Sequence, residues 1–509
     1  METKTAAIEM RNITKRFGPV LANDKVWLNI YRGEILALLG ENGSGKTTLM
    51  NMLSGIYFPD EGEIKIDGKE VVIRSPKDAF DNGIGMIHQH FKLVDVLTAA
   101  ENIVLGLPGK LDLKAASAKI REICDKYGFS VDPAQKIYDM SVSQKQTVEI
   151  VKVLYRGADI LILDEPTAVL TPQETDKLFA VLRNMRNDGK AYVIITHKMH
   201  EVEALSDRVA ILRHGQFIGD MLTAHTNAQE MTNMMVGHAV SLNIERPDPV
   251  DPKPRIEVKG LTVRSVDGIV KLDDVSFTAN SGEILGIAGI SGCGQKELLE
   301  AIAGLQTVES GSISYIEDDG SGEELIGKDP LSIAELGVSL SFVPEDRLGM
   351  GLVGNMNLAD NMMLRSFRRG KSIFTDRRSP RALAESVVQE LSVSTPSVDT
   401  PVRRLSGGNV QKVLVGREIA RAPTVLLTAY AVRGLDIHSS YTIYDLINRQ
   451  KKAGVAVIFV GEDLDVLLEL CDRILVLCGG KVSGIVSGRG AEKREVGMMM
   501  TKLGGQSHE

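Results

Sequence analysis

Residues 40–48 of this chain read Gly40-Glu41-Asn42-Gly43-Ser44-Gly45-Lys46-Thr47-Thr48. An apolar run, 34–39, precedes them and predicts a buried strand, while helix-forming residues follow over 49–53. A strand, a glycine-rich turn and a helix form the context that a phosphate-binding P-loop requires. In such a loop, backbone amides turn towards the phosphates, Lys46 reaches the β- and γ-phosphates, and the Thr47 hydroxyl coordinates Mg²⁺. The alternative, a chance glycine-rich turn, is disfavoured by the strand and helix on either side.

Two carboxylates end a second apolar run further along the chain. Residues 159–163 predict a strand, and Asp164 and Glu165 follow it directly. An acidic pair at the end of a buried strand suits Mg²⁺ binding together with a base for water. The alternative is a plain helix start, which fits poorly beside a P-loop. A third apolar strand, 191–196, leads to His197.

Bulk composition places the chain among globular proteins and limits its partners. Its 509 residues are enough for two or more domains, and 43% are hydrophobic. The net charge of −8, without an arginine-rich run, argues against nucleic-acid binding through bulk charge. No apolar run approaches the ~20 residues that span a bilayer, and the first residues lack a secretory signal pattern. The four cysteines lack metal-site spacing and suit a reducing cytosol.

The chain repeats itself after a proline-rich segment. Prolines at 247, 249, 252 and 254 mark residues 240–255 as an exposed linker between domains at 1–239 and 256–509. Residues 33–36, Gly-Glu-Ile-Leu, recur 249 positions later, and Asp207-Arg208-Val209 recurs 265 positions later as Asp472-Arg473-Ile474. The chain is therefore an internal duplication of two similar α/β nucleotide-binding domains.

The motif set as a whole resembles the ATPases of the ABC transporter family. It comprises the P-loop, Gln89, the Asp164-Glu165 strand, His197 and Leu405-Ser406-Gly407-Gly408-Asn409-Val410-Gln411. The resemblance covers nearly the whole chain. It implies two tandem P-loop NTPase domains, each with an α/β core, an antiparallel β part and a helical subdomain. Two cassettes in one chain resemble the ATPase subunit of bacterial sugar and nucleoside importers, and residues 86–93, 99–106 and 155–161 resemble the nucleoside branch.

In that family the cassettes pair head to tail, and each ATP lies between the P-loop of one and the signature segment of the other. The resemblance implies that the signature residues Ser406, Gly407, Gly408 and Asn409 close the first P-loop from the opposite face. The other implied roles are adenine stacking for Phe17, Mg²⁺ and water sensing for Gln89, Mg²⁺ binding for Asp164 and Thr47, general base for Glu165, and a γ-phosphate contact for His197.

The second copy lacks most of these groups. Lys46 maps to Gln295, Phe17 to Val266, Asp164 to Ala429, Glu165 to Tyr430, Gln89 to Glu345 and His197 to Glu462. The signature is instead intact in the second copy and degenerate in the first, where residues 140–144 read Met-Ser-Val-Ser-Gln. All intact parts therefore fall on one composite ATP site. The other site is expected not to hydrolyse ATP; whether it still binds nucleotide stays open.

These features predict an ATP-hydrolysing subunit at the cytoplasmic face of a membrane, working with ATP and Mg²⁺. Its expected partners are membrane permease subunits and, through them, an extracytoplasmic substrate-binding protein, with nucleosides as cargo. Coupling to the permease is expected through the helical regions at about 90–155 and 355–400. A monosaccharide importer is the first alternative, and a two-cassette translation factor is the second. A DNA-repair ATPase would need zinc-binding cysteine pairs or a long coiled coil.

Overall fold

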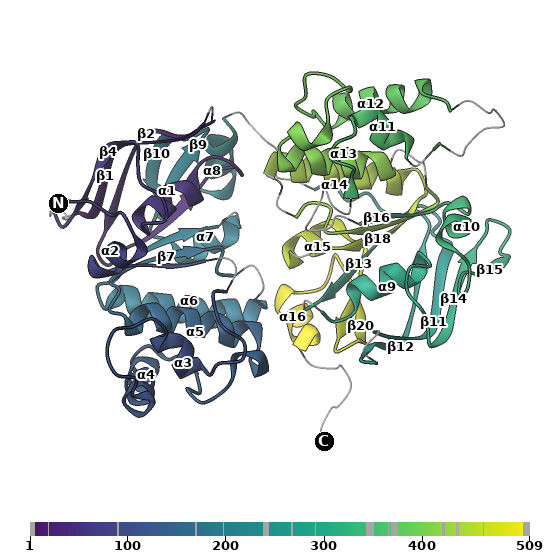
Figure 1. The fold of residues 1–509 in the computed structure, drawn as a ribbon. Helices are drawn as coiled ribbons and strands as arrows, with labels where there is room; N and C mark the ends of the chain where they lie inside the picture. The colour runs from purple at the N-terminus through teal and green to yellow at the C-terminus, as the bar shows by residue number, and fades with distance from the viewer. Residues whose placement is uncertain are drawn as a thin grey trace. The chain divides into compact units, whose positions relative to one another are not determined.

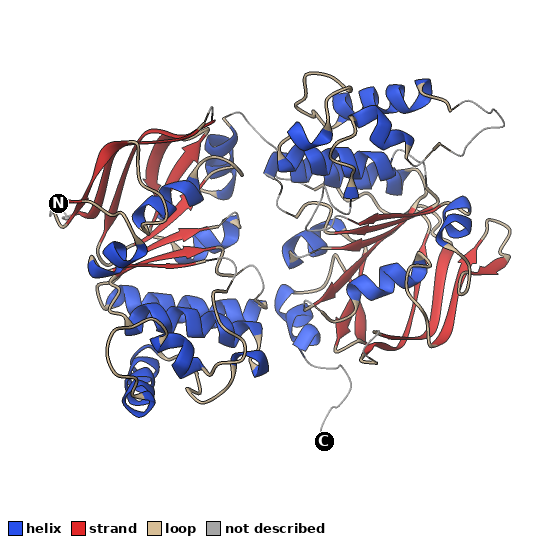
Figure 2. Cartoon of the chain, viewed as in Figure 1, coloured by secondary structure: helices blue, strands red, loops and turns tan. Residues whose placement is uncertain are grey.

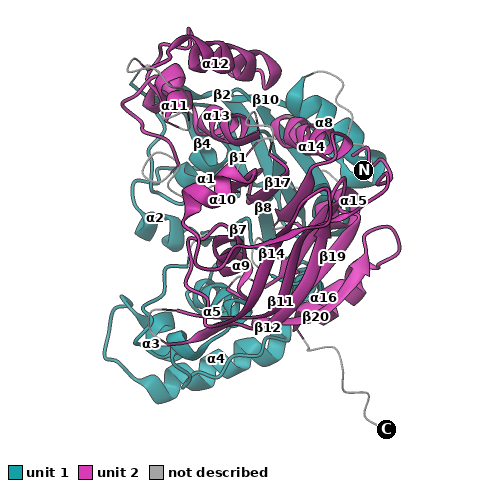
Figure 3. Ribbon diagram, turned by 90° about the vertical axis from the view of Figure 1, so that its right-hand side faces the viewer, with its two compact units in different colours: residues 1–241 teal, residues 242–509 magenta. Residues whose placement is uncertain are grey.

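The computed structural model divides the chain into two compact units, 1–241 and 242–509 (Figure 3). In both units, sheets are flanked by helices (Figure 2). The described residues are 6–18, 20–88, 91–167, 170–196, 198–237, 244–265, 268–290, 292–342, 351–364, 366–367, 375–419, 423–433, 435, 437–461 and 463–501.

The first unit contains two sheets (Figure 1). An antiparallel sheet has the order β2-β1-β4-β5, and a six-stranded sheet has the order β10-β9-β3-β8-β7-β6. In the larger sheet β9, β3, β8, β7 and β6 run parallel, and β10 pairs antiparallel at one edge. The strands are β1 (Ala6–Phe17), β2 (Val20–Tyr31), β3 (Ile35–Leu39), β4 (Glu61–Ile66), β5 (Lys69–Val71), β6 (Ile84–Ile87), β7 (Ile160–Asp164), β8 (Ala191–Ile195), β9 (Arg208–Arg213) and β10 (Gln216–Leu222).

Burial explains why these segments become strands. All five residues of β3 and all five of β8 are buried, as expected for parallel strands covered on both faces. By contrast, most of β2 alternates between buried and exposed residues, because only one face of the antiparallel sheet packs on the core. One apolar cluster lies between the two sheets and includes Ile8, Leu36 and Leu49. A second cluster covers the other face of the larger sheet.

The helices of the first unit include a helical region between β6 and β7, where α3, α4 and α5 share a separate small core built around Ile103, Ile120 and Val148. Strands β4 and β5 form a hairpin. The helices are α1 (Lys46–Leu53), α2 (Pro76–Asp81), α3 (Ala99–Val104), α4 (Leu113–Tyr127), α5 (Val142–Tyr155), α6 (Pro172–Asn187), α7 (Met199–Leu205) and α8 (Ala228–Val236).

The second unit repeats this plan. Its sheets have the orders β12-β11-β14-β15 and β16-β17-β18-β13-β19-β20, the latter with an antiparallel edge strand as in the first unit. Its strands are β11 (Pro254–Arg264), β12 (Val270–Asn280), β13 (Ile284–Gly289), β14 (Ser310–Ile316), β15 (Gly322–Glu324), β16 (Val338–Phe342), β17 (Val425–Ala429), β18 (Ala456–Val460), β19 (Arg473–Cys478) and β20 (Lys481–Ser487). Its helices are α9 (Gln295–Ile302), α10 (Pro330–Glu335), α11 (Leu358–Met363), α12 (Arg378–Glu390), α13 (Gly407–Ile419), α14 (Ile437–Lys452), α15 (Leu464–Leu470) and α16 (Lys493–Thr501).

One ion pair with a buried glutamate is repeated at equivalent positions. In the first unit, Nε of Arg208 donates to Oε1 of Glu34 at 2.9 Å. In the second unit, Arg473 pairs with Glu283 in the same way. Each arginine begins a strand that runs beside the strand leading to the glycine-rich loop of its unit.

The predicted fold class, two tandem α/β nucleotide-binding domains, is confirmed.

The proline-rich segment differs from the exposed linker that its composition suggests. Ile244 is buried in the core of the second unit, with 8% of its surface exposed. Arg246 donates two hydrogen bonds from Nη1, to the carbonyls of Leu468 and Cys471, each at 2.7 Å. Exposure rises further along, and Val250 is 87% exposed. Prolines signal a break in regular structure, but they do not decide whether that segment packs.

Across the described residues, none of the helices is both long enough and apolar enough to span a bilayer.

Candidate nucleotide-binding site

The glycine-rich loop of the first unit connects β3 to α1, as its sequence predicts. Gly45 caps α1 with a φ of 95°, a left-handed conformation that disfavours other residues. At Gly40 a Cβ atom would lie 2.2 Å from the carbonyl oxygen of Leu212, so no larger residue fits without moving the backbone. The loop therefore requires glycine at this position, because neighbouring backbone atoms occupy the space that a side chain would need.

Lys46 opens α1 and folds back over the loop. Its Nζ donates to the carbonyls of Gly40 at 2.6 Å and Glu41 at 2.9 Å. Burial lowers the pKa of the Lys46 ammonium to about 8, and the carboxylates of Glu165 and Asp164 oppose this shift. The structure thus brings the lysine and both predicted carboxylates within electrostatic range of one another.

Two further features of the loop fit a phosphate-bearing ligand. The Ser44 hydroxyl is buried and has no hydrogen-bond partner among the described residues. The Thr47 side chain is exposed at the start of α1, and Thr48 is partly exposed. The helix N-terminus directs free amide groups and a partial positive charge to the same place. An unsatisfied buried hydroxyl in such a loop is explained by an acceptor that arrives with the ligand.

Asp164 is the last residue of β7 and Glu165 follows it directly. One strand, β8, separates β7 from β3, the strand that leads to the P-loop. Burial raises the pKa of the Asp164 carboxyl to about 6, helped by Glu165 and opposed by Lys46. Glu165 adopts a φ of 48°, and its amide donates to the carbonyl of Ile195 at 2.9 Å. This turn places the two adjacent carboxylates at the carboxyl edge of the parallel strands, where ligands bind in open α/β sheets.

The oxygen groups here fit Mg²⁺ better than a softer metal. Thr47 offers a hydroxyl and Asp164 a carboxylate, both hard ligands, and Mg²⁺ usually takes few protein ligands while phosphates and water supply the rest. Among the described residues there is no cluster of three or more histidine, cysteine or acidic side chains of the kind that holds a metal by itself.

Phe17 stands at the end of β1 with 41% of its surface exposed. Its ring lies 5.1 Å from that of Tyr57, in an edge-on arrangement, and Nζ of Lys15 is 5.6 Å from its centroid. Sequence reasoning missed Tyr57. The apolar run 56–58, exposed directly after α1, was the signal available for it. An aromatic pair of this kind offers one free face to a base.

The remaining predicted site residues fall into two groups. Gln89 and His197 lie outside the described residues, although β6 and β8, which lead to them, end at the same sheet edge as β7. The signature residues Ser406 and Asn409 lie at the start of α13 in the second unit, where Nδ2 of Asn409 donates to Oγ of Ser406 at 2.9 Å. Gly407 and Gly408 form the first turn of that helix. That they close the site of the first unit stays a prediction.

The equivalent loop in the second unit also ends on a left-handed glycine at the helix start, but its side chains differ. Gln295 opens α9 as Lys46 opens α1, and Gly294 caps the helix with a φ of 99°. The Gln295 side chain is buried, and its Nε2 donates to the carbonyl of Ile290 at 3.2 Å. Ala429 occupies the position of Asp164 at the end of β17. No cationic group and no carboxylate replaces the missing ones at these positions.

The loop and the carboxylate pair define a nucleotide-binding cassette of the P-loop type. A family model described as ABC transporter matches residues 23–168 and 272–428, which is more than half of the chain. The chain belongs to this family.

Relatives match over nearly the full length. The nucleoside import ATP-binding protein NupA of Lactococcus lactis subsp. cremoris is 42% identical, covering 99% of each chain. The guanosine import ATP-binding protein NupO of Bacillus subtilis is 41% identical, covering 97% of each chain. The ribose import ATP-binding protein RbsA 1 of Rubrobacter xylanophilus is 38% identical, covering 96% of this chain and 97% of the relative.

A solved structure shares the two-unit fold at lower identity. It is the archaeal ribosome recycling factor aABCE1, crystallised with the ribosomal stalk protein aP1. The match has a TM-score of 0.60 at 16% identity and covers 91% of this chain and 87% of the other. At this identity the likeness concerns the fold alone.

Proposed function

We propose that this chain is the ATP-hydrolysing subunit of a bacterial ABC importer for nucleosides. One observation carries the proposal. An intact P-loop and carboxylate pair in the first unit accompany full-length likeness, at 42% and 41% identity, to two proteins whose names state nucleoside or guanosine import. The ribose-import relative, at 38%, supports the same machinery with a different cargo.

Each predicted site residue of the first unit has a role in the proposed reaction. Lys46 leaves the loop carbonyls and meets the β- and γ-phosphates, while the loop amides hold their oxygens. Thr47 and Asp164 would hold Mg²⁺, which would supply positive charge against the phosphates. Glu165 accepts a proton from the attacking water. Gln89 would sense Mg²⁺ and the attacking water, and His197 would contact the γ-phosphate.

We further propose that only this site hydrolyses ATP. The signature at 406–409 would complete it from the second unit, as the family resemblance implies. The opposite combination would pair Gln295, Ala429 and Tyr430 with a first-copy signature that lacks both glycines. Without a cation, a metal carboxylate or a base, that combination has no group to carry out the chemistry.

The proposed partners follow from import. A protein that drives import needs a membrane path, so we propose permease subunits that receive the helical regions of both units, with an extracytoplasmic protein delivering the cargo. The chain would then work at the cytoplasmic face of the membrane. A ribosomal role has only the fold likeness to aABCE1 in its favour.

Uptake in cells lacking this chain tests the proposal. Labelled uridine, guanosine and ribose would be supplied to cells complemented with wild type, Glu165→Gln, or the control Glu203→Gln. Glu203 is an exposed glutamate on α7, so this control makes the same chemical change away from the site. We expect nucleoside uptake with wild type and the control, and none with Glu165→Gln. If only ribose uptake follows this pattern, the importer is a sugar importer; if no uptake changes, the importer proposal fails.

A further inference from the structure

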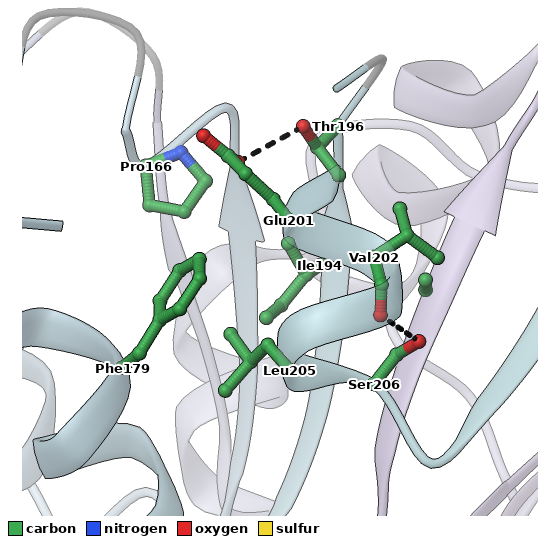
Figure 4. A pocket seen from close by; sticks show the side chains of 9 residues that line it. Pro166, Phe179, Ile194, Thr196, Glu201, Val202, Leu205 and Ser206 are labelled. Carbon is green, nitrogen blue, oxygen red and sulfur yellow. Dashed lines mark hydrogen bonds between the residues drawn. The ribbon is translucent and has the colours of Figure 1, made fainter. Parts of the chain in front are cut away.

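Glu201 is a buried carboxylate with no role in the site described so far. It lies on α7 with 4% of its surface exposed, a burial that an ionisable side chain tolerates only when its oxygens are satisfied. Both oxygens are satisfied by hydroxyl groups. Oγ1 of Thr167 donates to Oε1 of Glu201 at 2.5 Å, and Oγ1 of Thr196 donates to Oε2 at 3.3 Å. Figure 4 shows the carboxylate between Thr196 and Pro166.

A lysine closes the network. Nζ of Lys198 lies 3.2 Å from Oε1 of Glu201 and donates to the carbonyl of Thr167 at 3.2 Å. The backbone amide of Lys198 donates to Oγ1 of Thr196 at 3.1 Å. One carboxylate therefore connects two chain segments that are about thirty residues apart.

Each of these segments carries a predicted catalytic group. Thr167 follows Glu165 by two residues, and only Pro166 separates them. Thr196 and Lys198 are the immediate neighbours of His197 on either side. Glu201 itself is too deeply buried, and too well bonded, to contact a nucleotide. Its contacts instead fix where both segments leave the sheet.

Packing around Pro166 is incomplete on one side. A small cavity lies next to Pro166, lined mainly by apolar side chains such as Phe179, Ile194 and Leu205 (Figure 4). A gap on that side removes contacts that would otherwise hold the turn in place. The polar contacts to Glu201 therefore carry more of the constraint than they would in a filled core.

The second unit is a natural control for this network. Its β18 and α15 correspond to β8 and α7 at an offset of 265, and at that offset Glu201 becomes Val466, Thr167 becomes Val432, Thr196 becomes Gly461 and Lys198 becomes Asp463. Val432 and Val466 pack against the apolar core of that unit. The fold forms without the network, and the network is absent from the same unit that lacks the catalytic groups.

From this we propose that Glu201 is a positioning residue for hydrolysis: it couples the turn that carries Glu165 to the segment that carries His197. The proposal rests on the ATPase function proposed above. A displacement of about 1 Å in catalytic groups can lower a rate by about a hundredfold. Loss of Glu201 should therefore lower turnover while leaving ATP binding, which depends on the P-loop, nearly unchanged.

ATP turnover and ATP affinity of the purified full chain test this. Glu201→Val introduces the residue of the second unit, and the triple variant Thr167→Val, Thr196→Gly, Glu201→Val reproduces its whole apolar arrangement. We expect kcat to fall roughly ten- to hundredfold in both, with Kd for ATP within about twofold of wild type. The melting temperature of the triple variant should stay near that of wild type. Glu203→Val, the same change on the exposed side of α7, should leave kcat unchanged.

Thr167, which donates a hydrogen bond to Glu201, gives a second, milder test. Thr167→Val should lower kcat, and adding it to Glu201→Val should cause little further loss, because both changes break the same contact. A wild-type kcat in the triple variant overturns the proposal, as does a loss that is fully additive. If Glu201→Val does not fold, the triple variant and Thr167→Val decide the matter. Absence of hydrolysis by wild type would instead refute the proposed function.

Discussion

The ends of β7 and β17 show how the two units differ. Glu165 and Tyr430 both adopt a left-handed conformation, with φ of 48° and 57°. Both donate their amide to the last residue of the neighbouring strand, at 2.9 Å to Ile195 and 3.0 Å to Val460. A strained backbone at a non-glycine residue often accompanies function. Here the second unit keeps the conformation without the carboxylate, so the turn belongs to the fold and does not by itself indicate catalysis.

Conservative substitutions at this turn should give the largest difference in ATP turnover between the two units. Glu165→Gln removes the proposed general base and should lower ATP turnover by about 10²- to 10⁴-fold. Tyr430→Phe removes one hydroxyl at the equivalent place and should leave turnover within about twofold. Turnover of the purified chain at saturating ATP measures both. Equal losses would mean that both units take part in hydrolysis.

Substitutions at Lys46 and Gln295, the first residue of the helix after each loop, should give a smaller difference between the units in ATP binding and turnover. Lys46→Ala removes a cation that contacts phosphate and should weaken ATP binding about ten- to hundredfold, since such charged hydrogen bonds contribute about 1.5–3 kcal/mol. Gln295→Ala should leave most of the hydrolysis in place. Equilibrium titration with ATP and a turnover assay test the pair. A Gln295→Ala variant as inactive as Glu165→Gln would refute the single-site interpretation.

Equivalent substitutions in the helical regions of the two units should have the same effect on local stability. Asn102 accepts the amide of Val94 at 2.7 Å, and Asn361 accepts that of Val353 at 2.9 Å. Both asparagines are almost completely buried. Changing either to Ala leaves buried backbone groups unpaired, at a cost of about 2 kcal/mol, and should speed local amide exchange roughly thirtyfold. Hydrogen exchange measured on each region tests this; a change in only one would show that the units differ in stability as well as in chemistry.

The sequence predicted most of what depends on residues close together in the chain. The P-loop was visible because strand, turn and helix follow one another within 34–53, and the carboxylate pair because it directly follows the apolar run at 159–163. The duplication was visible because short segments recur at nearly constant offsets. The equivalent of Lys46 was also correctly placed at Gln295, since the offset holds across the loop. The roles of Gln89, His197 and the signature segment remain predictions.

What the sequence did not reveal depends on tertiary contacts. Glu201 reads as an ordinary polar residue of an amphipathic helix until Thr167 and Thr196 are placed above it. The edge-on contact between Phe17 and Tyr57 joins two segments forty residues apart. The burial of Ile244 was hidden by the prolines that follow it. In each case the deciding partner lies far away in the sequence, where pattern alone has no information.

Gln295, at the start of α9, has a consequence for the free energy available to each import cycle. With Gln295 in place of a lysine, the proposed importer has one hydrolytic event available for each closure of its cassettes, where a symmetric machine has two. The free energy of a single phosphoanhydride bond then limits the steepest concentration gradient that one import cycle can work against. Such a transporter exchanges maximum accumulation for economy in ATP per molecule imported.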